Sequence, residues 1–315
     1  MGHKILLVLL LLKNVLTFSC SKETERVNCE FIASNGDLED FYEHIPKFGE
    51  CTKKYNSSSF TLRLQNYSIP GLPNGTFSDL GSLEHFALII EDSWVALLSA
   101  LSGEYSAFQN LKFKSAVIDV SDSHTLSGWQ WNELHNITPE KDRPFELNLV
   151  RSKLVYLHPD FGQVANSRLT AIRILKCRLR WLGENVFEKF HDLKTLELRG
   201  NVIQRIERSH LPTTAPNLKA LDLGNNQLSN LPLNIFSGLH LNKVFLDGNN
   251  LKIPIQEIGH ILQTRPLPVF SGVLWPCSCD SLQQLLKVDF NYVHEYCYME
   301  NSRKDIRSTY QQFCN

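Results

Sequence analysis

The sequence predicts an α/β solenoid, in which short parallel strands stack one after another in front of an apolar interior. Three observations lead to this prediction. Leucines recur at a nearly constant step between Leu169 and Leu251. Cysteines gather on both sides of the repeating part, where the open ends of a stack must be closed. The hydrophobic content of 43% is ample for a folded core.

Four successive segments fit the pattern L-x-x-L-x-L-x-x-N/C-x-L. They begin at Leu169, Leu193, Leu218 and Leu241. The ninth position of the pattern returns at a nearly constant step and holds Cys177, Asn201, Asn226 and Asn249. This step lies in the range of leucine-rich repeats, so we expect a horseshoe whose parallel strands line the concave side.

The spacing inside each repeat has a physical basis. Leu196 and Leu198 are separated by one residue, so both side chains point to the same side of a short strand. A buried asparagine after the strand can bond the backbone of neighbouring turns, as buried polar groups must. Phe187 and Phe190 on the return segment are expected to fill the interior from behind. No repeat buries its apolar side alone, and stacking completes the core.

Weaker copies of the pattern precede the regular repeats. Tyr67 and Ser152 stand at the asparagine position in two of them. Further copies continue from Leu64 at a similar step, through Leu88 and Phe113. The period then breaks over 120–144, a segment that we interpret as a convex or edge insertion with two tryptophans. We therefore expect about eight repeats, of which the first four are irregular.

Residues 1–19 have the features of a secretory signal peptide. Lys4 precedes an apolar run, and Thr17 and Ser19 stand at the −3 and −1 positions of a cleavage site before Cys20. This run is shorter than the roughly 20 residues that a bilayer requires, and no later segment is apolar enough to span one. The expected parts are a signal peptide 1–19, an N-terminal cysteine-containing cap 20–59, repeats 60–272 (irregular over 60–144, regular over 145–254) and a C-terminal cysteine-rich cap 273–315.

Sequons and charge indicate the compartment and exclude one class of partner. Four candidate glycan acceptors precede x-S/T: Asn56, Asn66, Asn74 and Asn136. With the signal peptide and eight cysteines they indicate a secreted, extracellular glycoprotein. The net charge is −1, and removing residues 1–19 with their two lysines makes it −3. Such a chain gives no reason to expect a nucleic-acid partner.

Four cysteines follow the repeats: Cys277, Cys279, Cys297 and Cys314. A four-thiolate zinc site usually contains C-x₂-C rather than C-x-C, and a redox pair would need a thioredoxin-like βαβ context. The stretch VLWPCSC, followed by LQQLL, resembles the C-terminal cap of extracellular leucine-rich repeat proteins. That resemblance implies the disulfides Cys277–Cys297 and Cys279–Cys314, whereas the sequence alone allows three connectivities.

The other four cysteines are Cys20, Cys29, Cys51 and Cys177. Cys177 occupies the asparagine position of a repeat, so we expect a free thiol that points inward. The expected N-terminal disulfide is then Cys29–Cys51, with Cys20 spare, removed by cleavage or bridging to another chain. The sequence leaves the pairing of these three cysteines open.

No catalytic motif stands out in the chain. There is no G-x-S-x-G, no H-E-x-x-H and no glycine-rich phosphate loop at the right spacing. His294–Cys297 contains half of a zinc-protease motif, but the second histidine is missing. Acidic residues on successive strands are no acid–base pair without a cleft that shifts their pKa values apart. We expect a non-enzymatic protein without cofactor or metal; direct hydrolase activity is a competing hypothesis.

The predicted binding surface is the concave face, where the residues between the inward leucines face outward. The expected ligand-binding residues are Arg151, Arg173, Leu175, Lys176, Glu197, Arg199, Asp222 and Phe245. They predict a face with a basic middle and an acidic C-terminal side, with apolar groups that folding does not require. Apolar groups beside arginine are common at interface centres, although ordinary surfaces also carry scattered hydrophobic residues.

The layout of the chain resembles one further group. A short, cysteine-poor N-terminal cap, irregular first repeats and regular last ones are similar to the Oplophorus-luciferin 2-monooxygenase non-catalytic subunit group. The resemblance implies action by binding. We hypothesise a secreted protein that recognises an extracellular protein or a microbial surface ligand. The alternative is a non-catalytic auxiliary or carrier subunit in a hetero-complex with a secreted catalytic chain; the sequons disfavour a bacterial lipoprotein acylated at Cys20.

Overall fold

The structure is a computed structural model that describes residues 5–11, 14–23, 26–35, 48–98, 106–124, 126, 128–139, 143–251, 269–271, 275–285, 296–299 and 302–314. Two compact units make up the chain. The first unit comprises Met1–Val155 and Asp160–Cys177, and the second comprises Tyr156–Pro159 and Arg178–Asn315.

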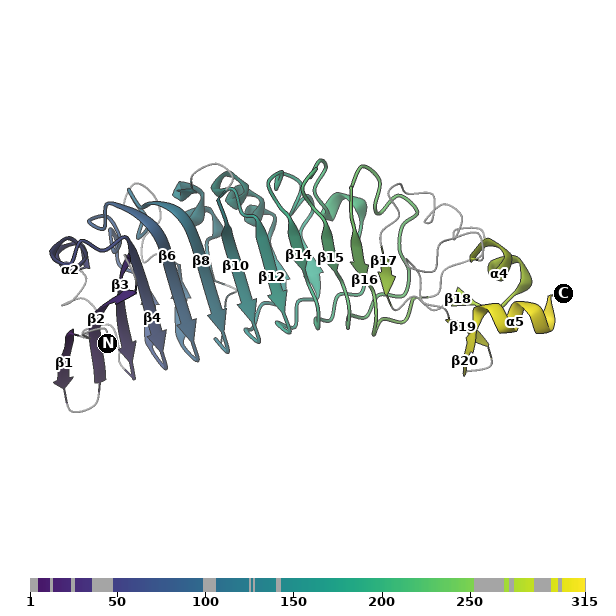
Figure 1. The fold of residues 1–315 in the computed structure, drawn as a ribbon, viewed down its shortest axis with the longest axis horizontal. Coiled ribbons are helices and arrows are strands. Elements are labelled where there is room, and N and C mark those ends of the chain that lie inside the picture. The colour runs from purple at the N-terminus through teal and green to yellow at the C-terminus, as the bar shows by residue number, and fades with distance from the viewer. Residues whose placement is uncertain are drawn as a thin grey trace. The chain divides into compact units, whose positions relative to one another are not determined.

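Strands of the first unit lie side by side in the order β1-β2-β3-β4-β6-β8-β10-β12 (Figure 1). Pairing is antiparallel from β1 to β3 and parallel from β3 onward. The bounds are β1 Ile5–Leu11, β2 Asn14–Glu23, β3 Arg26–Ser34, β4 Ser59–Gln65, β6 Ser82–Glu91, β8 Lys112–Ser121, β10 Phe145–Val150 and β12 Ala171–Leu175. Shorter pieces are α2 Phe48–Lys54, the parallel pair β5 Ser68–Gly71 and β7 Trp94–Leu97, and β9 Thr138–Pro139 beside β8.

The second unit contains four further parallel strands, β14 Thr195–Glu197, β15 Ala220–Asp222, β16 Lys243–Phe245 and β17 Val269–Ser271. A separate parallel pair joins β11 Tyr156–Leu157 to β13 Trp181–Leu182. The C-terminal part holds β18 Trp275–Pro276, α4 Cys279–Leu285, β19 Tyr296–Met299, β20 Ser302–Asp305 and α5 Ile306–Phe313.

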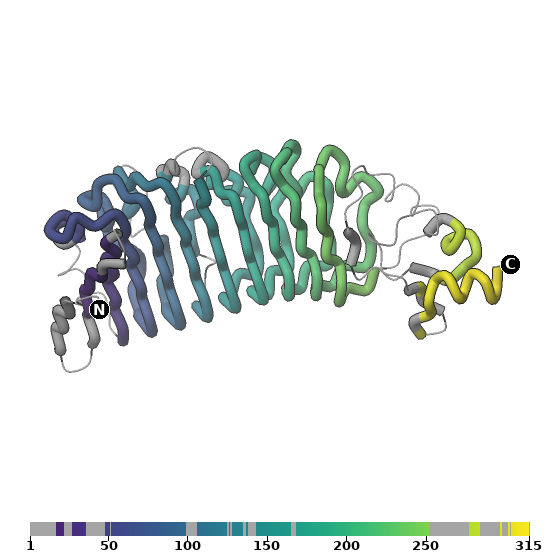
Figure 2. The backbone as a smooth tube through the Cα atoms, in the orientation of Figure 1, coloured from purple at the N-terminus to yellow at the C-terminus, as the bar shows by residue number. Residues whose placement is uncertain are grey.

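The stacked parallel strands form a β-solenoid, whose successive coils are visible in Figure 2. Neither the predicted α/β class nor the count of about eight repeats is confirmed. Between the parallel strands, the described return segments contain turns, α2, the short strands β5, β7, β9, β11 and β13, and three 3-10 helices: η2 Trp131–Asn136, η3 Pro159–Ser167 and η4 Arg208–His210. Trp129 and Trp131, beside and within η2, are buried, so the segment interpreted as an insertion contributes to the core.

Apolar side chains of the first unit form rows that cross the strands. Pairing places in one row Leu62, Leu88, Ile118, Leu147 and Ile172. A second row, further along each strand, holds Leu64, Ile90, Val120, Leu149 and Ile174. All of these side chains are fully buried. The strict alternation of buried and partly exposed residues along β10 follows from the alternating side-chain direction of a strand.

The predicted register is wrong for β6 and β8. Leu88 was expected beside Leu64 but pairs with Leu62. Phe113 was expected beside Leu88 but pairs with Leu83. These coils are therefore longer than the regular ones, so their strands pair with a shifted register.

A ladder of buried polar side chains follows the strands. In the second unit, Asn201 and Asn226 accept hydrogen bonds from the backbone of the preceding coil, each at 3.1 Å. Their amide groups also donate to the carbonyl of Leu198. In the first unit, Ser93 and Ser152 have the same role, because their hydroxyls accept from backbone N–H groups of the preceding coil at 3.0 and 3.1 Å. The buried, backbone-bonding role expected at Ser152 and Asn201 is observed.

Cys177 occupies the ladder position of β12 as a buried free thiol, as expected. Its Sγ donates to the carbonyls of Leu149 and Leu175 at 3.2 and 3.3 Å. Burial raises the pKa of this thiol from 9.0 to about 11. The folded state therefore binds the proton more tightly, and the resulting stabilisation is complete below pH 9 and lost between pH 9 and pH 11.

Alkylation of Cys177 at pH 8 is expected to be at least about a hundredfold slower in the folded chain than in urea, since only the thiolate reacts. Iodoacetamide labelling followed by peptide mass analysis measures both rates. Equal rates would contradict the buried ladder position.

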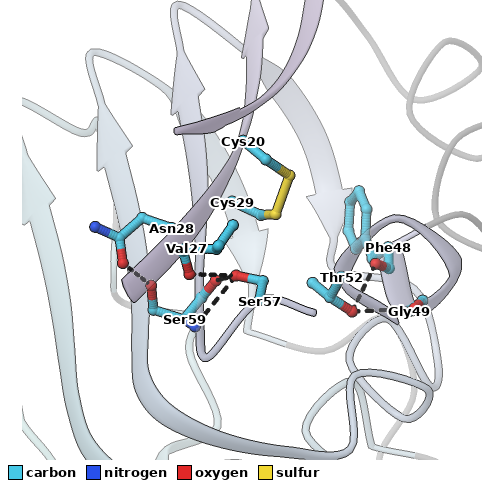
Figure 3. The surroundings of a disulfide bond; sticks show 9 residues. All are labelled: Cys20, Val27, Asn28, Cys29, Phe48, Gly49, Thr52, Ser57 and Ser59. Atoms are coloured by element: carbon cyan, nitrogen blue, oxygen red, sulfur yellow. Dashed lines mark hydrogen bonds between the residues drawn. A yellow bond between two sulfur atoms is a disulfide. The ribbon is translucent and has the colours of Figure 1, made fainter. Parts of the chain in front are cut away.

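The N-terminal disulfide joins Cys20 to Cys29, so the predicted Cys29–Cys51 pair is wrong. The two residues lie directly opposite each other on β2 and β3, with Cα atoms 4.1 Å apart (Figure 3). The side chain of Cys51 lies outside the described residues. Since β3 pairs in parallel with β4, the stack begins inside the range expected to form a cap. The expected signal peptide covers β1 and part of β2, and its cleavage stays a prediction.

The first coil is closed by α2 and its connections. Phe48 packs between Phe31 and Phe60, with ring centroids 4.9 and 5.0 Å away. The Thr52 hydroxyl donates to the carbonyls of Phe48 and Gly49, and Ser57 Oγ donates to the Val27 carbonyl at 2.7 Å (Figure 3). The ring contacts of Phe48 place α2 against the aromatic end of the interior, and the Ser57 bond joins the segment after the helix to β3.

In the C-terminal part, disulfides join Cys277 to Cys297 and Cys279 to Cys314, the pairing that the cap resemblance implies. The second bond connects the first residue of α4 to the residue after α5. Leu282 and Ile306 are fully buried. Asp305 caps α5 by accepting a hydrogen bond from the Ser308 N–H at 2.8 Å.

Candidate functional site

The solvent side of the first unit's sheet presents rows of side chains between the inward residues. One row runs through Ile32, Arg63, Ile89, Asp119, Asn148 and Arg173. The next runs through Ser34, Gln65, Glu91, Ser121, Val150 and Leu175. We call this surface the strand face. Asp119 belongs to it and was missed from the sequence because β8 was placed in the wrong register.

Four of the predicted binding residues lie on or beside the strand face. Arg173 and Leu175 point outward from β12 and are partly exposed. Arg151 and Lys176 each follow a strand, in left-handed backbone with φ of 50° and 57°. The equivalent turns after β3, β4, β6 and β8 use Asn35, Asn66, Asp92 and Asp122, which tolerate this conformation best.

The predicted basic middle is largely neutralised, because acidic neighbours pair with its arginines. Arg151 makes two 2.7 Å bonds to Asp122 of the preceding turn. Arg173 Nη1 lies 2.6 Å from Glu146. Arg63 bridges Glu30 and Glu91 at 3.2 and 2.9 Å, and Lys114 contacts Glu84 at 2.6 Å. Such partly exposed cross-strand pairs add little stability each, but they fix the side chains in place.

The other four predicted binding residues belong to the second unit. Glu197, Asp222 and Phe245 point outward from β14, β15 and β16 and are partly exposed. Arg199 bonds Asp222 at 3.3 Å and forms a two-pronged ion pair with Asp247. These bonds raise the pKa of the guanidinium, against the effect of burial. A Cβ at Gly224 would collide with Arg199, so glycine leaves the space that the guanidinium occupies.

A hollow of about 430 Å³ opens at the strand face near the start of β4, β6 and β8. Residues of five neighbouring strands, β3 to β10, line it: Asn28, Ser59, Phe60, Thr61, His85, Phe86, Ala87, Ser115, Ala116, Val117 and Glu146, with Pro144 just before β10. The lining combines apolar side chains with polar side chains that come from several strands. The Ser59 hydroxyl donates to Asn28, and Ser115 bonds His85 Nδ1. These pairings hold the lining in one arrangement.

Asp119 lies beyond the hollow on the same side of β8 as Val117. Its Cα partners on the adjacent strands are Ile89 and Asn148. Partial burial raises the pKa of its carboxyl group, Glu91 raises it further, and Arg63 lowers it. A carboxylate whose charged form is disfavoured on an open surface is a candidate contact for an incoming positive group.

The hydrogen bonds around Ser115 define the polar part of the hollow. Ser115 and His85 make the hydrogen bond of a nucleophile and a base, and Ser115 Oγ also lies 3.3 Å from the Glu84 carbonyl. An acyl-transfer site further needs backbone donors for an oxyanion. The Ala116 N–H, which follows Ser115 in the chain, already donates to the Pro144 carbonyl at 3.0 Å.

Three expected glycan acceptors, Asn56, Asn66 and Asn74, are exposed, and the side chain of Asn136 lies outside the described residues. Asn66 Nδ2 donates to Asn35 Oδ1 at 2.7 Å, at the end of the strand face. No helix in the described part of the chain has the length and apolarity needed to cross a membrane. Use of the sequons stays a prediction.

No family model and no curated protein match this chain. Solved structures that resemble it include the Toll–Spatzle complex, a molecular hub in Drosophila development and innate immunity. One such chain has a TM-score of 0.43 and 14% identity, over 79% of this chain and 36% of that one. A chain of the glycosylated form has a TM-score of 0.39 and 12% identity, over 92% and 53%. This chain thus spans about a third to a half of their length, and the resemblance to the Oplophorus group gains no support.

Proposed function

We propose that this chain is a non-enzymatic, extracellular binding protein that holds a protein ligand on the strand face of its first unit. The main observation behind the proposal is the hollow. There, five neighbouring strands present polar side chains next to apolar ones. An extended polypeptide laid across these strands would meet a hydrogen-bonding side chain on most of them. A microbial surface molecule is the alternative ligand.

Preorganisation supports this proposal. The charged side chains around the hollow are held by cross-strand ion pairs, and Ser115, His85, Ser59 and Asn28 are held by hydrogen bonds. A ligand would therefore order few side chains when it binds, which reduces the entropic cost of association. Leu175, Val150 and Ile89 extend the face with apolar groups that do not belong to the buried rows.

The test blocks the hollow without touching the core. Ala87 lines the hollow and Ala220 points outward from β15 of the second unit, so Ala87→Arg and Ala220→Arg place the same side chain on two different faces. Wild type and both variants are immobilised, and proteins captured from the source fluid are identified by mass. We expect Ala87→Arg to reduce capture of the main ligand at least about tenfold and Ala220→Arg to leave it unchanged.

Three outcomes would redirect the proposal. Loss of capture with Ala220→Arg alone would move the ligand to the second unit, where Asp222 and Phe245 lie. Equal capture by all three proteins would exclude the solvent side of the stacked strands in both units as the binding surface. A stoichiometric partner with enzyme activity would instead make this chain its auxiliary subunit.

A further inference from the structure

A second exposed surface lies in the second unit, on the short parallel pair β11–β13. Tyr156 and Trp181 are direct partners in this pair. Both are large and solvent-exposed, Tyr156 by 36% and Trp181 by 52%, whereas Leu157 and Leu182 beside them point into the core. Two neighbouring aromatic rings turned toward water have no packing role that would explain them, and such groups are informative when they occur together.

Polar groups with positive or titratable character flank the two rings. The Arg180 guanidinium lies over the Trp181 ring, 4.7 Å from its centroid. The His158 ring packs against Tyr156 with centroids 4.3 Å apart. Pro159 lies so close to Gly183 that a Cβ there would approach its ring to 2.6 Å, which fixes the segment after His158 against the strand pair. Tyr156, His158, Arg180 and Trp181 thus form one ordered surface, which we call the aromatic patch.

Arg180 differs from the arginines of the strand face in its charge partners. Arg63, Arg151 and Arg173 each have a carboxylate within ion-pair distance. Within the described ranges, no carboxylate forms an ion pair with Arg180, whose guanidinium contacts the Trp181 ring. The face of the guanidinium therefore packs on the Trp181 ring, and the N–H donors at its edge can bind a ligand. Arginine stacked on tryptophan in this manner is suited to two-pronged binding of a carboxylate.

We propose that Tyr156, His158, Arg180 and Trp181 form a docking surface for an acidic segment of a partner protein, with an aromatic or aliphatic side chain next to its carboxylate. The carboxylate pairs with Arg180, and the apolar side chain covers the exposed rings. Tryptophan, tyrosine and arginine are the residues that most often dominate binding energy at interfaces. The aromatic patch belongs to the second unit and the strand face to the first. Either proposal can therefore be wrong while the other is right.

The test selects ligands for the patch and then removes its parts. A phage-displayed library of random short peptides is selected on the full-length wild-type chain, and enriched peptides are measured by fluorescence anisotropy. We expect them to combine Glu or Asp with an aromatic or aliphatic residue. Trp181→Ala should weaken their binding at least about tenfold, and Arg180→Gln should weaken it with loss of its dependence on salt.

Trp94 provides a matched control for this test. It is 40% exposed on β7, in the equivalent two-stranded pair β5–β7 of the first unit. Trp94→Ala should leave peptide binding unchanged. Far-UV circular dichroism should show that all variants keep the wild-type fold, since the substituted side chains are exposed.

Three results would overturn the proposal. If the enriched peptides lack acidic residues, or if no peptide is enriched, an acidic segment is excluded as the ligand of the patch. Equal losses of peptide binding in Trp94→Ala and Trp181→Ala would show that the peptides bind any exposed tryptophan and not the aromatic patch. Binding of a sulfated polysaccharide that depends on Trp181, with no enriched peptide, would identify a carbohydrate surface instead.

Discussion

Replacing Asn226 with alanine is expected to lower the free energy of unfolding by about 4 kcal/mol, although this side chain lies away from both proposed surfaces. Asn226 is buried and makes four hydrogen bonds. Its Oδ1 accepts from the Ile203 N–H at 3.1 Å, and its Nδ2 donates to the carbonyls of Leu198, Leu223 and Gly224 at 2.9, 3.0 and 3.3 Å. Alanine would leave the buried Ile203 N–H without its partner, at about 1–3 kcal/mol, and would remove three further bonds at about 0.5–1.5 kcal/mol each. The three carbonyls keep one donor each, from Asn201, Asn249 and the Gly200 N–H.

Urea unfolding of Asn226→Ala and of the neighbouring Gln227→Ala measures this effect. Gln227 is exposed, and its side chain accepts a single bond from Gln204 at 3.1 Å, so its loss should change stability by less than about 0.5 kcal/mol. Asn226→Asp keeps the acceptor for Ile203 but removes the donors, and it should be nearly as destabilising as alanine. A loss below about 1 kcal/mol in Asn226→Ala would mean that the ladder does not hold the coils together.

The same ladder explains which parts of the fold could be predicted from the sequence. Where the ladder residue is Asn or Cys, as at Asn201, Asn226 and Cys177, it identifies the strand end unambiguously, and the outward positions follow by counting. Arg173 and Asp222 were therefore placed on the solvent side correctly. In the earlier coils the ladder residues include Ser93 and Ser123, which do not stand out among other serines.

The missed register of β6 and β8 has a physical reason. Both strands are long alternating runs, and sliding an alternating run by one full alternation leaves every side chain on its own face. The apolar pattern therefore cannot distinguish Leu62 from Leu64 as the partner of Leu88. Only the strand pairing shows that Ile89 and Asp119 share a row. The pairing also brings Arg63 and Arg173 next to acidic partners that are far from them in the sequence.

The error at the N-terminal cysteines has a different origin. Assigning Cys177 to the interior left three N-terminal cysteines, and Cys20 was taken as spare or removed by cleavage, so Cys29 was assigned to Cys51. The antiparallel pairing of β2 and β3 instead brings Cys20 and Cys29 together across a short hairpin. Local hairpin geometry decided the pairing, and a count of cysteines contains no such information.

Removing the Cys279–Cys314 disulfide is expected to destabilise the C-terminal part more than removing Cys277–Cys297. The sequence separation of the bonded cysteines is 35 for the first bond and 20 for the second. Because a cross-link restricts the unfolded chain more when the closed segment is longer, the losses should be roughly 4 and roughly 3 kcal/mol. The effect should be concentrated in α4 and α5, since the bond joins the start of one helix to the residue after the other.

Hydrogen exchange on Cys279→Ser/Cys314→Ser and Cys277→Ser/Cys297→Ser tests both the size and the place of the loss. In the first variant, the protected amides of Leu282 and of position 314 should exchange about a thousandfold faster than in wild type, whereas those of the Asn226 ladder should keep their rates. A solenoid permits this because each coil depends mainly on its neighbours, so an opened end does not unfold the rest at once. Equal losses in the two variants would contradict the entropic ranking. Acceleration throughout the second unit would show instead that the disulfide-bonded part and the coils unfold as one.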